Sequence, residues 1–222
     1  MINNNDKIIK DNTMSEVLKR LGAIRLVPVV VLEDAKNAEP LAEALIAGGL
    51  PCAEVTFRTA AAAESIKRIS KYKEMCLGAG TVLSVDQAML AIDSGATFIV
   101  SPGFNPKVVK YCVENKIPIT PGICTPTEIE MGLEYGLTIF KFFPAEAYGG
   151  LKTLKAISAP YGMIKFIPTG GIDAKNVREY LSLKQVVACG GSWMVTKEMI
   201  SNRKFNEVTT LAQEAVNLVK GL

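Results

Sequence analysis

The chain has 222 residues, of which 49% are hydrophobic and 21% charged, and a formal net charge of +3 at pH 7, which fits one large domain with a substantial core. This weak net charge, without a basic run interleaved with aromatic residues, argues against a nucleic-acid partner. The lack of histidine excludes Ser-His-Asp and Cys-His catalysis and a His-ligated zinc ion, but leaves an oxygen-ligated Mg²⁺ site open.

The amino-terminal residues 1–13 are polar and contain no apolar segment of the kind found in signal peptides. We expect them to form an extension outside the folded domain, which then spans residues 14–222. The segment Thr13-Met14-Ser15-Glu16 has the pattern of a capping box, and apolar residues follow it at helical spacing, so an extra N-terminal helix is predicted. No apolar run approaches the ~18 residues of a membrane helix, and we therefore expect a cytoplasmic protein with no membrane partner.

Eight short apolar runs alternate with helix-like stretches along the rest of the chain. The strands are expected at Arg25–Leu32, Cys52–Arg58, Cys76–Val82, Phe98–Gly103, Ile117–Cys124, Thr138–Ala145, Lys165–Ile172 and Val186–Trp193. The helices are expected at Ala38–Ala47, Ala60–Ile69, Val85–Asp93, Pro106–Asn115, Pro126–Tyr135, Leu151–Ile157, Ala174–Leu181 and Phe205–Val219.

This alternation predicts an α/β fold, a single (β/α)8 TIM barrel with an extra N-terminal helix. The expected strands are apolar on both faces, as parallel strands covered by helices must be. Eight consecutive βα units favour a closed barrel. An open doubly wound sheet is the alternative, but it usually has fewer strands, and no Gly-x-Gly-x-x-Gly turn follows the first strand.

The five cysteines are expected to be reduced core residues. Their number is odd, their spacing is wide, and most of them lie in apolar strand-like runs, which argues against a disulfide framework. No Cys-x-x-Cys pair is present, so a structural zinc site is not expected.

The second expected strand carries two charged residues, Glu54 and Arg58. Because side chains alternate between the two faces of a strand, both should face the barrel interior, opposite the apolar set of Ala53, Val55 and Phe57. A buried carboxylate needs a partner or a function, so Glu54 is either a general acid/base or the partner of a buried lysine. The planar fork of Arg58 suits a substrate carboxylate, although an arginine at a strand end more often forms a surface salt bridge.

The third and fourth expected strands end in small residues, at Gly78-Ala79-Gly80-Thr81 and Ser101-Pro102-Gly103. In a barrel, the carboxyl ends of the strands surround the active site. Small residues there let a ligand approach the backbone, and Thr81 adds a hydroxyl group. Glycine and proline also mark ordinary βα turns, so these two segments are weak signals alone.

The sixth expected strand contains Lys141 in an otherwise apolar run, Thr138–Ala145. Lysine is rarely buried without a partner or a function. Burial disfavours the ammonium form, and a neutral lysine is a nucleophile that forms a Schiff base with a carbonyl compound. The alternatives are a strand-end lysine that reaches water and a lysine paired with a buried carboxylate.

Paired glycines end the seventh and eighth expected strands. The two segments are Thr169-Gly170-Gly171 and Gly190-Gly191-Ser192. The loops after these two strands of such barrels often hold a phosphate group with backbone N–H groups. Two ordinary tight turns are the alternative, but their shared position on neighbouring strands favours a phosphate site.

Six segments together resemble the family of 2-keto-3-deoxy-6-phosphogluconate (KDPG) aldolase, also described as 4-hydroxy-2-oxoglutarate (KHG) aldolase. They fall in order on six expected strands, and the resemblance covers residues 14–222. The segments are Glu54–Thr59, Gly78–Thr81, Val100–Gly103, Phe140–Glu146, Pro168–Ile172 and Gly190–Trp193. The resemblance implies a class I aldolase, without metal or other cofactor, that forms a homotrimer of (β/α)8 barrels.

The resemblance also implies roles for residues around the reacting carbon atoms. Lys141 matches the lysine that forms the Schiff base, and Glu54 matches the acid/base residue, which works through a bound water. Arg58 matches the residue that grips the carboxylate of the pyruvyl group, with Thr81 and Pro102 beside it. The substrate would be cleaved to pyruvate and glyceraldehyde 3-phosphate.

The far end of the substrate has its own matching residues. Gly170, Gly171 and Ser192 match the phosphate site of the family. Thr169 lies where the family senses the configuration of a hydroxyl group, and a threonine there favours the gluconate over the galactonate substrate. The sequence does not rank KDPG against KHG.

Two other functions stay open from the sequence. One is an isomerase or decarboxylase acting on a sugar phosphate, in which Lys141 acts as a general acid and forms no imine. The other is a non-catalytic barrel that only binds a phosphorylated ligand. The combination of Glu54, Arg58 and Lys141 argues against a simple binding protein, since binding alone needs no buried nucleophile.

Overall fold

The structure, a computed structural model, describes residues 16–222. The expected polar extension over residues 1–13, and most of the expected capping box at Thr13–Glu16, lie outside the described residues. Residues 16–24 form a helix that precedes the first strand.

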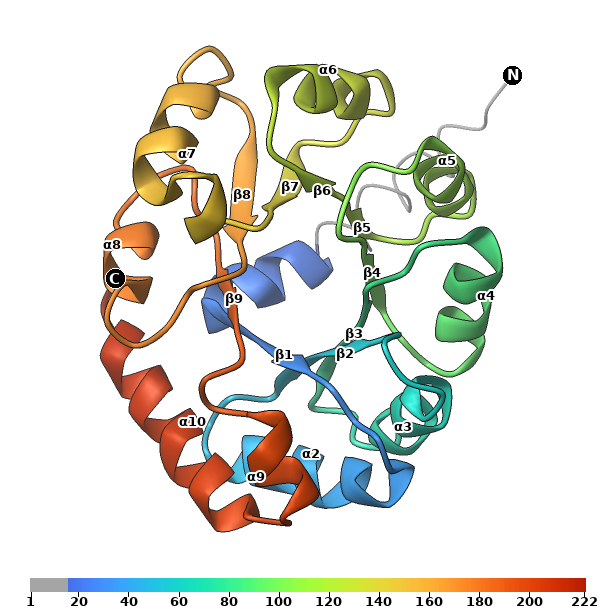
Figure 1. The fold of residues 1–222 in the computed structure, drawn as a ribbon. Coiled ribbons are helices and arrows are strands. Elements are labelled where there is room, and N and C mark those ends of the chain that lie inside the picture. The colour runs from blue at the N-terminus through green and yellow to red at the C-terminus, as the bar shows by residue number, and fades with distance from the viewer. Residues whose placement is uncertain (1–15) are drawn as a thin grey trace.

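Within residues 16–222, nine short strands are present, and helices separate all of them except β5 and β6 (Figure 1). The strands are β1 (Leu26–Val30), β2 (Cys52–Thr56), β3 (Cys76–Gly80), β4 (Phe98–Val100), β5 (Ile119–Thr120), β6 (Gly122–Ile123), β7 (Ile139–Phe142), β8 (Lys165–Pro168) and β9 (Cys189–Gly191). The α-helices are α2 (Ala38–Ala47), α3 (Ala62–Ile69), α4 (Val85–Asp93), α5 (Pro106–Glu114), α6 (Pro126–Glu134), α7 (Gly150–Ser158), α8 (Val177–Leu181), α9 (Lys197–Ser201) and α10 (Phe205–Val219). Two 3₁₀ turns, Ala35–Asn37 and Glu146–Tyr148, precede α2 and α7.

All strand pairs are parallel, and the sheet curls so that the helices lie on its outer side (Figure 1). One sheet has six strands in the order β5-β4-β3-β2-β1-β9, and a second has three in the order β6-β7-β8. Two isolated bridges, Phe166 with Val186 and Thr169 with Gly190, connect the chain around β8 to the chain around β9. The fold is therefore an α/β fold with a curled parallel sheet.

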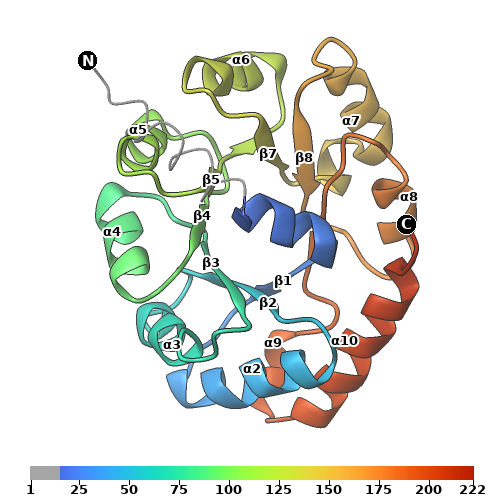
Figure 2. The same ribbon diagram turned by 180° about the vertical axis from the view of Figure 1, so that it is seen from behind.

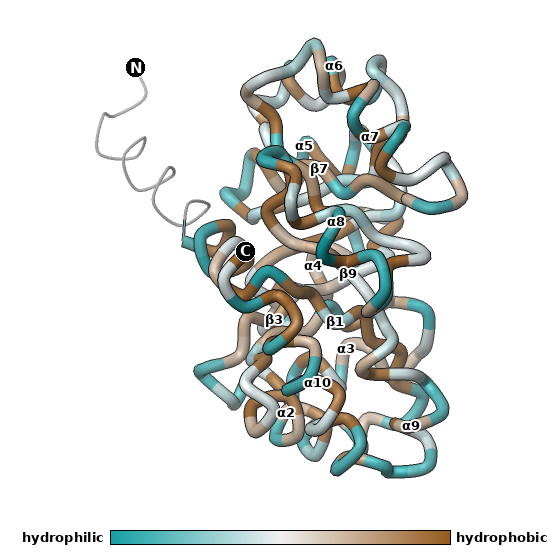
Figure 3. The backbone as a smooth tube through the Cα atoms, turned by 90° about the vertical axis from the view of Figure 1, so that its left-hand side faces the viewer, coloured by the Kyte–Doolittle hydropathy of each residue, from teal (hydrophilic) through white to brown (hydrophobic). Residues whose placement is uncertain are grey.

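The hydrophobic residues divide into two clusters, one on each side of the strands. The larger cluster packs the outward-facing strand residues against the helices and includes Ala53, Val55 and Phe140. The smaller cluster lies on the inner side and contains Val17 and Leu21 of the helix over residues 16–24. Figure 2 shows this helix across the end of the strands opposite the viewpoint of Figure 1. Hydrophobic residues follow the strands and the packed sides of the helices, and polar residues concentrate in the outer turns (Figure 3).

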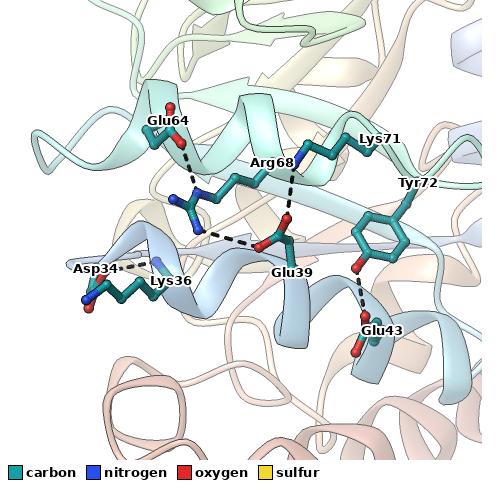
Figure 4. A network of polar contacts seen from close by, with 8 residues as sticks. All are labelled: Asp34, Lys36, Glu39, Glu43, Glu64, Arg68, Lys71 and Tyr72. Carbon is teal, nitrogen blue, oxygen red and sulfur yellow. Dashed lines mark hydrogen bonds and ion pairs between the residues drawn. The ribbon is translucent and has the colours of Figure 1, made fainter.

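A polar network links α2 and α3 on the outer surface (Figure 4). The Arg68 guanidinium pairs with Glu64 at 2.9 Å and with Glu39 at 3.5 Å. The Tyr72 hydroxyl donates to Glu43 at 2.7 Å, and this hydrogen bond raises the pKa of Tyr72 to about 12. Because exposed ion pairs contribute little to stability, this network orients α3 on α2 more than it stabilises the fold.

The expected strands end too late, and one of them is interrupted. Expected strands two, three, seven and eight extended two to four residues beyond the observed β2, β3, β8 and β9. Arg58 and the pair Gly170-Gly171 therefore lie in loops, whereas Gly190 and Gly191 are the last residues of β9. The fifth expected strand is split into β5 and β6 at Pro121, which has no N–H group to donate to a neighbouring strand. The short helix α9 was not expected, because five residues are too few to show helical periodicity.

The five cysteines, Cys52, Cys76, Cys112, Cys124 and Cys189, are free thiols. Four of them are buried in the core, whereas Cys124 is only partly buried. Within residues 16–222, no helix is long and apolar enough to cross a membrane.

Candidate active site

Lys141 lies on the inner face of β7. Its neighbours Phe140 and Phe142 are fully buried on the outer face, where Phe140 packs against Gly132 of α6. Lys141 itself is only 5% exposed, so it does not reach water from a strand end. Its Nζ lies 3.3 Å from Oε1 of Glu54 and 4.9 Å from the centre of the Phe143 ring. The structure therefore pairs the buried lysine with a buried carboxylate.

Glu54 reaches this lysine from β2, across the inside of the curled sheet. All five residues of β2 are buried, and Glu54 is 3% exposed. Its side chain lies against Gly80 on β3, where an added Cβ would be 2.1 Å from Oε1 of Glu54. Glycine at this position of β3 thus makes the space that the carboxylate occupies.

The close packing of the Glu54 carboxylate against Gly80 gives a prediction. Gly80→Ala should push the Glu54 carboxylate away from Lys141 and lower kcat about 100-fold, since a displacement of about 1 Å is enough for such a loss. The extra methyl group should also destabilise the fold by about 1–3 kcal/mol. Steady-state kinetics and urea unfolding measure both effects. Gly162→Ala is the control, because a Cβ at Gly162 would contact nothing within 4 Å, and a similar loss of kcat there would contradict the argument.

A small internal space lies beside the Lys141–Glu54 pair. It measures about 10 Å³ and is bounded by both side chains, by Thr120 and Thr169, and by apolar residues that include Leu21. That volume suits one water molecule, and four of its lining side chains are polar, as a buried water requires. Proton transfer between Glu54 and a bound molecule can therefore run through a single water.

A larger cavity opens at the carboxyl ends of β1, β8 and β9. Its volume is about 340 Å³, and Thr169 borders both this cavity and the internal space. The cavity brings together seven of the residues that the sequence analysis selected: Arg58, Thr169, Gly170, Gly171, Gly190, Gly191 and Ser192. Its lining contains two cationic side chains, Arg58 and Lys197, and no carboxylate, so it suits an anionic ligand.

The loop after β8 has a backbone conformation that favours glycine and leaves backbone N–H groups unpaired. Gly170 and Gly171 have φ values of 98° and 77°, a conformation that side chains other than glycine rarely adopt. A Cβ on Gly171 would also lie 2.6 Å from Glu146. Within residues 16–222, the N–H groups of Gly170, Gly171 and Ser192 donate to no backbone or side-chain acceptor. Three unpaired N–H groups on residues that line one cavity are available as donors to an anion.

The structure separates Thr81 and Pro102 from this cavity. Pro102 borders a neighbouring cavity of about 220 Å³ that also contains Cys124 and Tyr148 and that shares Phe143 with the first. Thr81 is half-buried, has a φ of 55°, and borders neither cavity. Within residues 16–222, no group of three or more Cys, Asp or Glu side chains could hold a metal ion.

Sequence reasoning missed two features of the site, Lys197 and the contact between Glu146 and Tyr180. Tyr180 of α8 is fully buried, and its hydroxyl donates to the Glu146 carboxylate. Burial and this carboxylate raise the pKa of Tyr180, which keeps its hydroxyl protonated as a donor. The backbone N–H of Glu146 donates in turn to the carbonyl of Gly170 at 3.1 Å, so the contact fixes the glycine loop to α8.

We therefore expect Tyr180→Phe to lower the free energy of unfolding by about 1–2 kcal/mol, since it removes one hydrogen bond to a charged group. Urea unfolding of the purified variant measures this change. Tyr161→Phe is the matched control, because the Tyr161 hydroxyl donates to Glu130 at 2.9 Å on the exposed surface, where the loss should be too small to detect. Equal effects of the two substitutions would show that the part-buried contact of Tyr180 with Glu146 stabilises the fold no more than the exposed one of Tyr161 with Glu130.

Comparisons with known proteins identify the family of this chain. The family model described as "KDPG and KHG aldolase" matches residues 17–211. The 2-dehydro-3-deoxy-phosphogluconate aldolase of Treponema pallidum is 49% identical over 93% of this chain and 99% of its own length.

Two solved structures of KDPG aldolases are also similar. The enzyme of Zymomonas mobilis ZM4, solved with 3-phosphoglycerate, has a TM-score of 0.84 and 38% identity over 92% of this chain and 95% of its own. The enzyme of Legionella pneumophila, with pyruvate captured as a covalent carbinolamine, has a TM-score of 0.83 and 40% identity over 87% of this chain and 96% of its own. The family model spans most of the chain, and relatives with this level of identity have names for the same aldolase. The chain therefore belongs to the KDPG and KHG aldolase family.

Proposed function

We propose that this protein is a class I aldolase that cleaves KDPG to pyruvate and glyceraldehyde 3-phosphate, with KHG as a second substrate that gives pyruvate and glyoxylate. The observation that carries the proposal is the buried Lys141, 3.3 Å from Glu54, beside an internal space that shares Thr169 with a cavity containing two cations and no carboxylate. The pair supplies a nucleophile and an acid/base group, and the cavity suits a substrate that is anionic at both ends.

Substrate binding in this proposal uses both ends of the molecule. Arg58 forms a bidentate contact with the C1 carboxylate. Pro102 approaches the pyruvyl group from the neighbouring cavity, which shares Phe143 with this one, and Thr81, which borders neither cavity, has no contact role in the proposal. The phosphate is bound by the N–H groups after β8 and β9, at Gly170, Gly171 and Ser192. Gly190 and Gly191 line the same cavity, and their lack of side chains leaves the space that Thr169 and Trp193 occupy. Thr169 borders both the cavity and the internal space, and this position supports a role in sensing the hydroxyl configuration.

The chemistry begins when the amine of Lys141 attacks the C2 ketone. Glu54 and a water transfer protons as the carbinolamine loses water and becomes a protonated imine. This cation accepts the electron pair of the C3–C4 bond, which breaks as Glu54 takes the proton of the C4 hydroxyl and the aldehyde leaves. The remaining enamine takes a proton at C3, and hydrolysis of the imine releases pyruvate. The iminium is the electron sink, so the mechanism needs neither metal nor other cofactor.

The proposal includes the finer architecture. The two sheets form one closed (β/α)8 barrel in which β5 and β6 count as a single strand, and the helix over residues 16–24 closes its amino-terminal end. Residues 14–222 form one domain. The bridges around β8 and β9, and the inner position of Val17 and Leu21, support this view.

We also propose a homotrimer located in the cytoplasm. Three large apolar residues in and just before α4, Leu83, Met89 and Leu90, are 45–55% exposed, and a subunit contact would bury them. The five free thiols fit a reducing compartment. Light scattering coupled to size-exclusion chromatography measures the subunit number.

Borohydride trapping tests the proposed function. The protein is incubated with pyruvate and sodium borohydride, digested and examined by mass spectrometry, and cleavage of KDPG is followed in parallel through pyruvate release. We expect a reduced pyruvyl adduct on Lys141. A folded protein that forms no adduct but isomerises or decarboxylates a sugar phosphate would contradict the proposal, as would a protein that only binds such a ligand.

A further inference from the structure

One cation of the cavity has no role in the chemistry described above. Lys197 borders the cavity as the first residue of α9, directly after the loop that contains Ser192. Its Nζ pairs with Glu33 at 2.7 Å, and Glu33 belongs to the loop after β1, the strand next to β9. Glu33 is not among the cavity-lining residues, so the lysine is at the cavity edge and its counter-ion is outside.

Lys197 can leave Glu33 for another anionic partner at little cost in stability. The two side chains are 57% and 55% exposed, and an ion pair with that access to water contributes little to stability. A phosphate monoester carries a charge of about −1.5 to −2 at pH 7 and presents three acceptor oxygens. It is therefore a stronger partner for an ammonium group than a single exposed carboxylate.

The phosphate also needs a cation at this end of the cavity. The unpaired N–H groups of Gly170, Gly171 and Ser192 are neutral, and they would share a doubly charged group. Arg58 follows β2, whereas the unpaired N–H groups follow β8 and β9, and Lys197 follows β9 as well. Of the two cations in the lining, Lys197 is the one on the phosphate side.

We propose that Lys197 leaves Glu33 on substrate binding and pairs with the substrate phosphate, and that Glu33 competes with the phosphate for it. This inference rests on the proposed function. Lys197 is then a specificity-determining residue that favours phosphorylated substrates. Glu33 weakens this preference, because it competes with the phosphate for Lys197.

The test compares a phosphorylated substrate with one that has no phosphate. Lys197→Met should raise KM for KDPG about tenfold, because it removes a hydrogen bond to a charged group, while kcat stays within about twofold. The pyruvate concentration that half-saturates borohydride trapping should not change, since pyruvate does not reach the phosphate side. Lys197→Arg should keep KM within about threefold, and Glu33→Gln should lower it about twofold.

Lys204→Met is the matched control. Lys204 forms a similarly exposed ion pair, with Glu207 at 3.3 Å, but borders neither the cavity nor the internal space, so neither measurement should change. An unchanged KM in Lys197→Met would overturn the inference, and so would an equal rise in the KM for KDPG and the half-saturating pyruvate concentration. A wild-type protein that traps no pyruvate would instead overturn the proposed function.

Discussion

Lys141→Met is expected to abolish aldol cleavage, with kcat/KM at least about 10⁴-fold below the wild-type value, and to remove the borohydride adduct. No other lysine borders the cavity or the internal space except Lys197 at the outer edge, within residues 16–222. Methionine has nearly the same length as lysine but no amine, so the shape of the internal space is kept while imine formation becomes impossible. Cleavage assays and mass spectrometry of trapped protein measure both effects.

The substitution also leaves Glu54 buried without a cation, which has a separate cost. We expect the free energy of unfolding to fall by about 3 kcal/mol, as when one partner of a buried ion pair is removed. Near-ultraviolet circular dichroism shows whether the variant is folded, and the double variant Lys141→Met/Glu54→Gln should recover part of the stability without recovering activity. Lys152→Met, on the exposed face of α7, is the control for the loss of a lysine. An adduct that persists in Lys141→Met would place the imine elsewhere.

The sequence predicts the bounds of several helices well. The expected bounds of α2, α4 and α10 match the observed ones, and Ser84 caps α4 by accepting a hydrogen bond from the N–H of Gln87, as a serine at that position should. The strand ends are less well predicted. Apolar residues continue past the last ladder hydrogen bond, because the loops at the carboxyl ends pack against the same core.

The residues of the candidate site also differ in how well the sequence predicts them. Lys141 and Glu54 could be found from the sequence, because a charged residue inside an apolar strand is rare and needs an explanation. Lys197 could not, since exposed lysines near helix starts are common and only the fold places this one beside a cavity. The contact between Tyr180 and Glu146 joins residues 34 positions apart and leaves no local pattern in the sequence.

Glu54→Gln is expected to lower kcat about 10³-fold while the Lys141 adduct with pyruvate still forms, more slowly. Glutamine has the size of glutamate and can still accept a hydrogen bond from Lys141, but it cannot take up a proton. Proton transfer by a positioned side chain contributes typically 10²–10⁴-fold to a rate. The loss should therefore appear in the steps that move protons at C3 and C4 more than in binding.

Exchange of the pyruvate methyl protons in D₂O isolates one of these steps, because it requires the enamine to form and to be reprotonated at C3. Nuclear magnetic resonance should show this exchange slowed about as much as kcat in Glu54→Gln. If Glu54 served only as the structural partner of Lys141, the substitution would lower the melting temperature and leave exchange within about tenfold of the wild-type rate. The 3.3 Å ion pair is compatible with both roles, and the exchange rate separates them, since a structural partner transfers no proton.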